Sequence, residues 1–258
     1  MKAHVVSSSL PAIPGEVLVR HAVQRWVTRL AGPLWVPAAA GVLRFWGGYR
    51  IERLRALRRQ FASIRRETNG PLLICANHLT LVDSFIVAWG LAPWWRLVFQ
   101  SDWLPWNTPE QTNFAVGPAS RMLTYLAKCI PVTRGGDRRS VAGVLSRLAY
   151  LLSRGDLALL FPEGGRSRTG RVDASSGAWG VGRIVGSLPS CRVLCVYLRG
   201  KLQDSWSDYP ARGEHFHMAM CSFEPKSDYR GARRSRDIAQ QIIGQLASME
   251  RDYFDGRQ

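Results

Sequence analysis

Residues 72–83 read LLICANHLTLVD, in which a short apolar run leads directly into polar side chains. An uninterrupted apolar run of this length is typical of a strand that is buried on both faces of a sheet. Similar runs occur at residues 97–100, 129–133, 157–161 and 192–198, and stretches with helical periodicity separate them. Because strands alternate with helices, the sequence predicts an α/β fold with a mixed, mostly parallel sheet flanked by helices.

Further elements follow from the same patterns. Helical periodicity predicts helices at residues 119–128 and 137–153, and Asp137 stands where it can cap the second of them. Apolar and polar residues alternate at 215–223, which predicts an additional edge strand, and residues 235–254 have the pattern of a closing amphipathic helix. The chain shows no internal repeat, so all these elements are expected to form one body.

Residues 26–46 are the most membrane-like stretch of the chain. Arg29 and Arg44 interrupt this stretch, which argues against a clean membrane span. Pro33 and Pro37 each lack the backbone donor that a helix interior needs. The sequence therefore predicts two short helices here.

Arginines and apolar residues alternate at helical spacing through residues 50–66, which predicts a basic amphipathic helix. We expect an N-terminal helical, membrane-associating segment, residues 1–69, that packs on an α/β domain, residues 70–258. In the membrane interface, tryptophans lie at headgroup depth and arginines attract anionic lipid. The alternative is a helical subdomain with packed tryptophans and a solvated arginine face.

The charge balance points to an anionic partner. The 258-residue chain has 35 Lys and Arg against 19 Asp and Glu, a net charge of +16, whereas its apolar content of 46% is that of an ordinary globular protein. Nucleic acid, a phospholipid surface and a phosphorylated substrate would each fit. The arginine-rich segments 50–66 and 230–236 lack the interleaved aromatic residues of a nucleic-acid platform, so no nucleic-acid partner is expected and an anionic membrane surface is preferred.

Five cysteines are scattered through apolar stretches, which indicates buried thiols in a reducing compartment rather than a disulfide framework. Cys191, Cys195, His215 and His217 could suggest zinc, but residues four apart on a strand are about 13 Å apart, so no metal is expected. Residues 1–15 lack the apolar run of a signal peptide. A cytoplasmic location follows.

The first candidate site lies where residues 72–76 end, because open α/β sheets bind ligands at the carboxyl ends of their strands. His78 can accept a proton at neutral pH, and a carboxylate such as Asp83 can hold its other ring nitrogen in the required tautomer. A strand end and the first turn of a helix could bring the two side chains together. The alternative is a histidine and an aspartate that merely cap the turn.

Two further strand ends carry glycines and arginines. Residues 161–170 read FPEGGRSRTG, in which glycines free backbone N–H groups, arginines such as Arg166 can grip a phosphate, and Glu163 can orient them or accept a bond from a hydroxyl. Residues 130–136 end another run with Arg134 and two glycines. The three strand ends are expected to face one pocket.

With these motifs in order, the sequence resembles the glycerolipid acyltransferases typified by lysophosphatidic acid acyltransferase. The resemblance covers about residues 71–198 and rests on three pieces, which are Asn77-His78 with Asp83 at the His-x-x-x-x-Asp spacing, Ile-Pro-Val-Thr-Arg ending at Arg134, and Phe-Pro-Glu-Gly-x-Arg-Ser at residues 161–167. Two departures concern the acceptor end. Gly165 stands where the family usually has Thr, and residues 193–197 lack the usual Val-Pro pair.

The resemblance implies His78 as general base and Asp83 as its orienting partner. The substrate-binding residues that it implies are Asn77, Arg134, Glu163, Gly164, Arg166 and Ser167, with Glu163, Arg166 and Arg134 on the glycerol phosphate. Fold, activity and location are expected to follow the family, with the N-terminal helices in the membrane interface on the cytoplasmic side.

The reaction implied by the resemblance is direct acyl transfer. The donor would be acyl-CoA or an acyl carrier protein thioester, and the acceptor a lyso-phospholipid such as 1-acylglycerol 3-phosphate, with no further cofactor and no metal. Another hydroxylated lipid or a secondary metabolite is the alternative acceptor, and a basic protein that binds nucleic acid or anionic lipid is the non-enzymatic alternative. Cys75 is not expected to act as a nucleophile, because its alternation with apolar neighbours favours burial.

Overall fold

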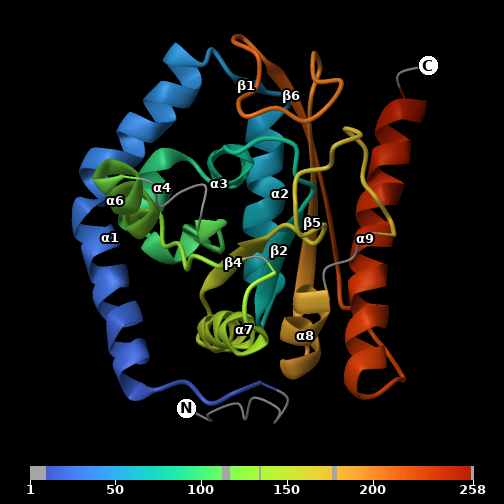
Figure 1. Ribbon diagram of the computed structural model, residues 1–258. Coiled ribbons are helices and arrows are strands. Elements are labelled where there is room, and N and C mark those ends of the chain that lie inside the picture. The colour runs from blue at the N-terminus through green and yellow to red at the C-terminus, as the bar shows by residue number, and fades with distance from the viewer. Residues whose placement is uncertain (1–9, 112–116, 134, 176–178, 257–258) are drawn as a thin grey trace.

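The computed structural model describes residues 10–111, 117–133, 135–175 and 179–256. A six-stranded sheet lies between helices, in the order β1-β6-β5-β2-β4-β3 (Figure 1). Neighbouring strands are parallel except β5 and β6, so the predicted mixed, mostly parallel sheet with flanking helices is confirmed. The strands are β1 (Arg50–Ile51), β2 (Leu72–Ala76), β3 (Trp106–Asn107), β4 (Leu157–Leu160), β5 (Arg192–Gly200) and β6 (His215–Phe223).

Helices cover both faces of the sheet. On one face lie α7, α8 and α9, and on the other lie α2 and α3 (Figure 1). The described helices are α1 (Gly15–Gly41), α2 (Leu54–Glu67), α3 (Asp83–Leu91), α4 (Trp94–Phe99), α6 (Pro118–Leu126), α7 (Arg138–Ser153), α8 (Trp179–Ser187) and α9 (Gly231–Asp255), with short turns η1 (Val42–Trp46) and η2 (Ser101–Trp103).

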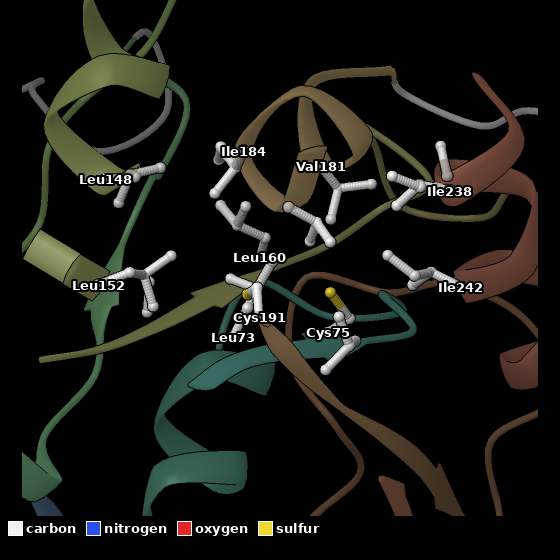
Figure 2. Close-up of a cluster of buried hydrophobic side chains, with 14 of the residues drawn as sticks. Leu73, Cys75, Leu148, Leu152, Leu160, Val181, Ile184, Cys191, Ile238 and Ile242 are labelled. Carbon is white, nitrogen blue, oxygen red and sulfur yellow. The ribbon is translucent and has the colours of Figure 1, made fainter. Parts of the chain in front are cut away.

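The strand β2 lies at the centre of the core. Side chains alternate along a strand, so Leu73 and Cys75 point toward α8 and α9, whereas Leu72 and Ile74 point toward α2 and α3. Figure 2 shows Leu73 and Cys75 within the first of these clusters, with Cys75 on the side of Ile242 of α9. All five residues of β2 are buried, as expected for a strand covered on both faces.

Two of the predicted strands take other conformations. Residues 97–100 belong to α4 and the residue after it, because Leu97 and Val98 pack on Val36 of α1 and helical geometry turns both toward that helix. Residues 129–133 form only isolated parallel bridges, Cys129 with Asn107 and Val132 with Glu110. Pro131 has no N–H to donate, which interrupts the ladder at this point.

The prediction of two short helices at residues 26–46 was wrong. The described part of α1 is one continuous helix with Pro33 and Pro37 inside it, and η1 extends it by a π-helical turn. A proline costs a backbone hydrogen bond, but α1 packs along α4 and α6, and this tertiary packing outweighs the local cost. None of the described helices combines the length and the apolarity that a membrane span requires.

The elements near the predicted domain boundary pack together. The basic amphipathic helix predicted at residues 50–66 is α2, but it begins only at Leu54, because residues 50 and 51 form β1. Its Leu57 and Phe61 are buried against the sheet. The predicted edge strand is β6. One of its edges pairs with β5, and on the other edge only its first two residues pair, with β1. Residues on both sides of position 69 therefore belong to one sheet. Whether residues 1–69 and residues 70–258 can fold independently is a separate question, and the predicted boundary between them stays a prediction.

Candidate functional site

A cavity of about 930 Å³, including its open mouth, lies beyond the carboxyl ends of β2 and β4. His78 and Arg166 line it, so the first and second sequence motifs share one cavity. More than half of the other lining residues are apolar, and they come from α3, α6, β4 and the segment around β3, for example Phe85, Ala88, Leu104, Leu123, Leu159 and Phe161. The cavity offers an apolar space with a base and a cation at its wall.

The side chains of His78 and Asp83 form a buried pair. Nδ1 of His78 lies 3.0 Å from Oδ2 of Asp83, the first residue of α3. The same oxygen accepts hydrogen bonds from the backbone N–H groups of Leu79 (2.6 Å) and Thr80 (2.8 Å). Asp83 therefore caps the turn and orients the imidazole at once. With Nδ1–H donating to the carboxylate, Nε2 of a neutral His78 is left to accept a proton.

The second motif holds His78 from the other side. The ring of Phe161 stacks on the imidazole, with centroids 3.9 Å apart and planes 15° from parallel. The backbone N–H of His78 donates to Oε1 of Glu163 (3.1 Å), and its carbonyl accepts from the backbone N–H of Ser167 (3.0 Å). Residues 161–167 thus fix both the ring and the peptide group of the candidate base.

The side chain of Asn77, which was predicted to bind substrate, forms hydrogen bonds to β5. Its Nδ2 donates to the carbonyl of Leu198 (2.9 Å), and its Oδ1 accepts from the N–H of the same residue (2.7 Å). The side chain is buried and is not part of the cavity wall. Asn77 therefore ties the end of β2 to β5 and continues the sheet beyond the last strand residue.

Glu163 is also outside the cavity wall, and its carboxylate lies behind His78. Burial raises the pKa of Glu163 from its usual 4.5 to about 7, although the backbone N–H groups of His78 and Asp173 favour the charged form. The predicted contact of Glu163 with a phosphate stays a prediction, and the contact in the structure is to the peptide of His78.

The raised pKa of Glu163 predicts a pH-dependent stability. Between pH 4.5 and about 7 the folded protein keeps a proton that the unfolded chain has lost, so this group makes the wild-type protein less stable as the pH rises through that window. Glu163→Gln stays neutral, and we expect its melting temperature relative to wild type to increase from pH 4.5 to 7 and then to level off. A difference in melting temperature between the two proteins that stays constant from pH 4 to 8 would contradict this assignment.

The guanidinium of Arg166 is held on one side. Its Nη1 donates to Oδ1 of Asp208 (2.7 Å) and to the carbonyl of Ser207 (3.0 Å). The group also stands over the ring of Trp206, 4.6 Å from the centroid. Arg166 therefore lines the cavity as a positioned cation with an acidic partner that was not foreseen, and its binding of an anion stays a prediction.

The remaining predicted residues of the second and third motifs are arranged as follows. Gly164 turns the chain with φ of +70°, a backbone conformation that favours glycine, and Ser167 Oγ contacts Thr169 and the carbonyl of Arg171. Neither residue is part of the cavity wall. Arg134 lies outside the described residues.

Three of the five thiols are buried in the core of the protein. Cys75 is fully buried, and burial raises its pKa well above the ordinary value, so it stays protonated. Cys191 and Cys195 are also buried in the core. In the part of the chain that the structure describes, no group of three or more His, Cys, Asp or Glu residues is arranged to hold a metal ion.

Sequence reasoning missed the residues that reach the site from a distance. Ser207 and Asp208 lie in the loop between β5 and β6, about forty residues after Arg166, and the apolar wall comes partly from α6 and the segment around β3. No local spacing links these segments to His78. Residues 206–208, Trp-Ser-Asp, lie between two predicted strands, but they match no motif that would have indicated their role.

Comparison with known proteins places this geometry in a family. The family model described as Acyltransferase matches residues 50–199, which is more than half of the chain and includes His78, Asp83 and the 161–167 motif. No match was found among curated proteins. The family includes proteins like lysophosphatidic acid acyltransferase. On the extent of this match, the chain belongs to this acyltransferase family.

Proposed function

We propose that this acyltransferase moves a fatty acyl group from acyl-CoA or acyl carrier protein to the hydroxyl of a lyso-phospholipid such as 1-acylglycerol 3-phosphate. The observation that carries the proposal is the His78–Asp83 pair at the wall of an apolar cavity that also holds Arg166. The pair supplies a base, the apolar wall suits an acyl chain, and the guanidinium suits a phosphate.

The proposed chemistry is direct transfer. Nε2 of His78 takes the proton of the acceptor hydroxyl while its oxygen attacks the thioester carbonyl, and Asp83 stabilises the imidazolium that forms. The tetrahedral intermediate then collapses, the C–S bond breaks, and the thiolate takes the proton from His78. The products are an ester and a free thiol, and the enzyme returns unchanged without a covalent intermediate.

The role proposed for Arg166 depends on the shape of its guanidinium. Nη1 is occupied by Asp208 and Ser207, so the edge formed by Nε and Nη2 is the part that can bind a phosphate through two bonds. A lysine has one ammonium group, which cannot bind Asp208 and present a fork to a phosphate at the same time.

Arg166→Lys is therefore expected to raise the KM for a phosphate-bearing acceptor about tenfold with a smaller effect on kcat, because the lost contact holds substrate and transition state alike. The measurement is a series of initial rates over acceptor concentration. Arg168→Lys is the matched control, since Arg168 is exposed and is not part of the cavity wall. Equal kinetics in Arg166→Lys and wild type would argue against bidentate phosphate binding.

We place the enzyme at the cytoplasmic surface of an anionic membrane, held by the outward face of α1. The residues of α1 that turn away from the protein body form an exposed apolar stripe: Val19, Val23, Trp26, Val27, Leu30 and Leu34. The opposite stripe, with Gln24, Thr28 and Val36, is buried. A helix that is apolar on its outer side fits a lipid interface better than water.

Three further observations support this location. In η1, Phe45 and Trp46 continue the exposed apolar surface beyond α1. The exposed Arg20, Arg29 and Arg44 stand beside it and can attract anionic headgroups. Helix α6, which forms part of the cavity wall, packs on α1, since Gln24 Nε2 donates to the carbonyl of Tyr125 at 2.9 Å. Trp35, by contrast, is partly buried against α4.

The direct test is an acyl-transfer assay with the full-length protein, an acyl-CoA and lysophosphatidic acid in mixed vesicles, followed by mass spectrometry of the lipids. Formation of phosphatidic acid that depends on the protein supports the proposal. Transfer to a different hydroxylated lipid in a panel would keep the reaction and replace the acceptor. Absence of any acylated product with both acyl-CoA and acyl carrier protein donors would contradict the proposed function.

A further inference from the structure

The loop between β5 and β6, residues 201–214, lies against the candidate base. The backbone N–H of Ser207 donates to the carbonyl of Leu79 (3.1 Å), and the backbone N–H of Leu81 donates to the carbonyl of Asp208 (3.1 Å). These two bonds connect the loop to both sides of Thr80, inside the turn that joins His78 to Asp83. The loop is therefore fixed relative to the catalytic pair by its backbone.

Residues 206–208 of this loop contact the guanidinium of Arg166 both at one edge and on its flat face. Asp208 Oδ1 and the Ser207 carbonyl accept from Nη1, at 2.7 and 3.0 Å, and Trp206 contacts the plane of the guanidinium. Within the described residues, no hydrogen bond to Nε or Nη2 is found. Three successive residues thus fix the orientation of the cation, which lines the cavity, and leave its Nε/Nη2 edge without a described hydrogen bond.

We infer that Asp208 is a positioning residue for acceptor recognition, which orients Arg166 so that its Nε/Nη2 edge meets the phosphate of the acceptor. The inference rests on the proposed function, because it assigns Arg166 to a phosphate-bearing lipid. An arginine that is held in its binding orientation before the ligand arrives loses less rotamer entropy on binding. Asp208 contributes geometry, and Arg166 contributes the charge.

Two facts separate this role from simple stabilisation. The side chain of Asp208 is 63% exposed and that of Arg166 is 21% exposed, and ion pairs open to water contribute little to stability. A carboxylate beside a phosphate site also weakens the attraction for the anion, so its presence there is explained by orientation rather than by charge. Asp208 further lies beyond residues 50–199, the part of the chain that matches the family model.

The test compares Asp208→Asn with Asp204→Asn, which removes the same charge from the same loop at an exposed residue whose side chain has no described contact to Arg166. Each protein is assayed with lysophosphatidic acid and with a monoacylglycerol of the same acyl chain. We expect Asp208→Asn to raise the KM for lysophosphatidic acid about tenfold and to reduce the preference for it over monoacylglycerol by a similar factor, with kcat within about threefold. Asp204→Asn should keep both.

Three results would overturn the inference: an unchanged preference in Asp208→Asn, equal effects in the two variants, or an equal loss with both acceptors, which indicates a role in the His78 turn only. Failure of the proposed function is seen separately, as a wild-type protein that acylates neither lipid. A calorimetric titration with glycerol 3-phosphate then still decides on Asp208. Binding by wild type that is about tenfold weaker in Asp208→Asn supports the positioning role, and equal or undetectable binding contradicts it.

Discussion

Replacing His78 by alanine is expected to abolish acyl transfer, with a fall in kcat of about a thousandfold or more, in a protein that still folds. The alanine variant has no base at the position where Nε2 would take the proton, and general base catalysis of this kind contributes about 10²–10⁴-fold. Asp83→Asn should also lower kcat strongly, because an amide N–H toward Nδ1 favours the tautomer with the proton on Nε2. Initial rates with a saturating donor and acceptor measure both effects.

The exposed His215 on β6 provides the control, since His215→Ala removes a histidine that is not part of the cavity wall and should keep wild-type rates. Circular dichroism shows whether the His78 variant is folded. Wild-type turnover in His78→Ala would contradict the assignment of His78 as the base.

Direct transfer also predicts that no covalent acyl-enzyme forms. Wild-type protein incubated with donor alone should keep its mass, and a stable acyl group on Cys75 or on a serine would contradict the mechanism.

The parts of the fold that could be predicted are those in which local sequence and burial agree. The runs at β2, β4 and β5 are apolar without interruption because helices cover both faces of the sheet, and this makes them recognisable. Asp137 was expected to cap a helix, and its carboxylate accepts from the N–H of Ser140 at 3.1 Å. In each case the neighbours along the chain decide the structure.

The predictions from sequence were wrong where contacts between residues distant in the chain determine the local structure. The run at residues 97–100 is as apolar as a strand, but its partner is α1, so a helix that turns Leu97 and Val98 inward is favoured. Pro33 and Pro37 stay inside a helix because packing on α4 and α6 holds α1 together. The grip of Asp208 on Arg166 joins segments 42 residues apart, and no spacing rule indicates such a contact. For the candidate site, the sequence indicated His78, Asp83 and Arg166, whereas their supports had to be seen in three dimensions.

The second large effect concerns the membrane. We expect the wild-type protein to float with liposomes that contain anionic phospholipid at low salt, and less so at high salt, because arginine attraction is screened. The double variant Leu30→Glu, Leu34→Glu should lose this binding. The two leucines are 74% and 80% exposed on the outer stripe of α1, so each change removes about 2 kcal/mol of apolar burial in the interface and adds a charge there.

Substitutions are more informative here than a deletion of the N-terminal segment, because removal of residues before 69 would also remove β1 and the buried Phe61, and would expose the sheet. The matched control is Tyr229→Glu, a change at a 56% exposed side chain that precedes α9 in the sequence. Helix α9 lies on the opposite side of the molecule from α1 (Figure 1). It should leave flotation unchanged. Binding that persists in the leucine variant, or no binding of the wild-type protein to anionic liposomes at low salt, would contradict the membrane assignment.

The same variants connect location with chemistry. If α1 holds the cavity at the leaflet, an acceptor in vesicles reaches His78 without leaving the lipid, whereas a short-chain acceptor dissolved in water does not need the membrane at all. The leucine variant is therefore expected to acylate the vesicle-bound acceptor at least about tenfold more slowly, and the dissolved acceptor at the wild-type rate. Equal losses with both acceptors would mean that the outer stripe of α1 serves the fold of the site and not its contact with lipid.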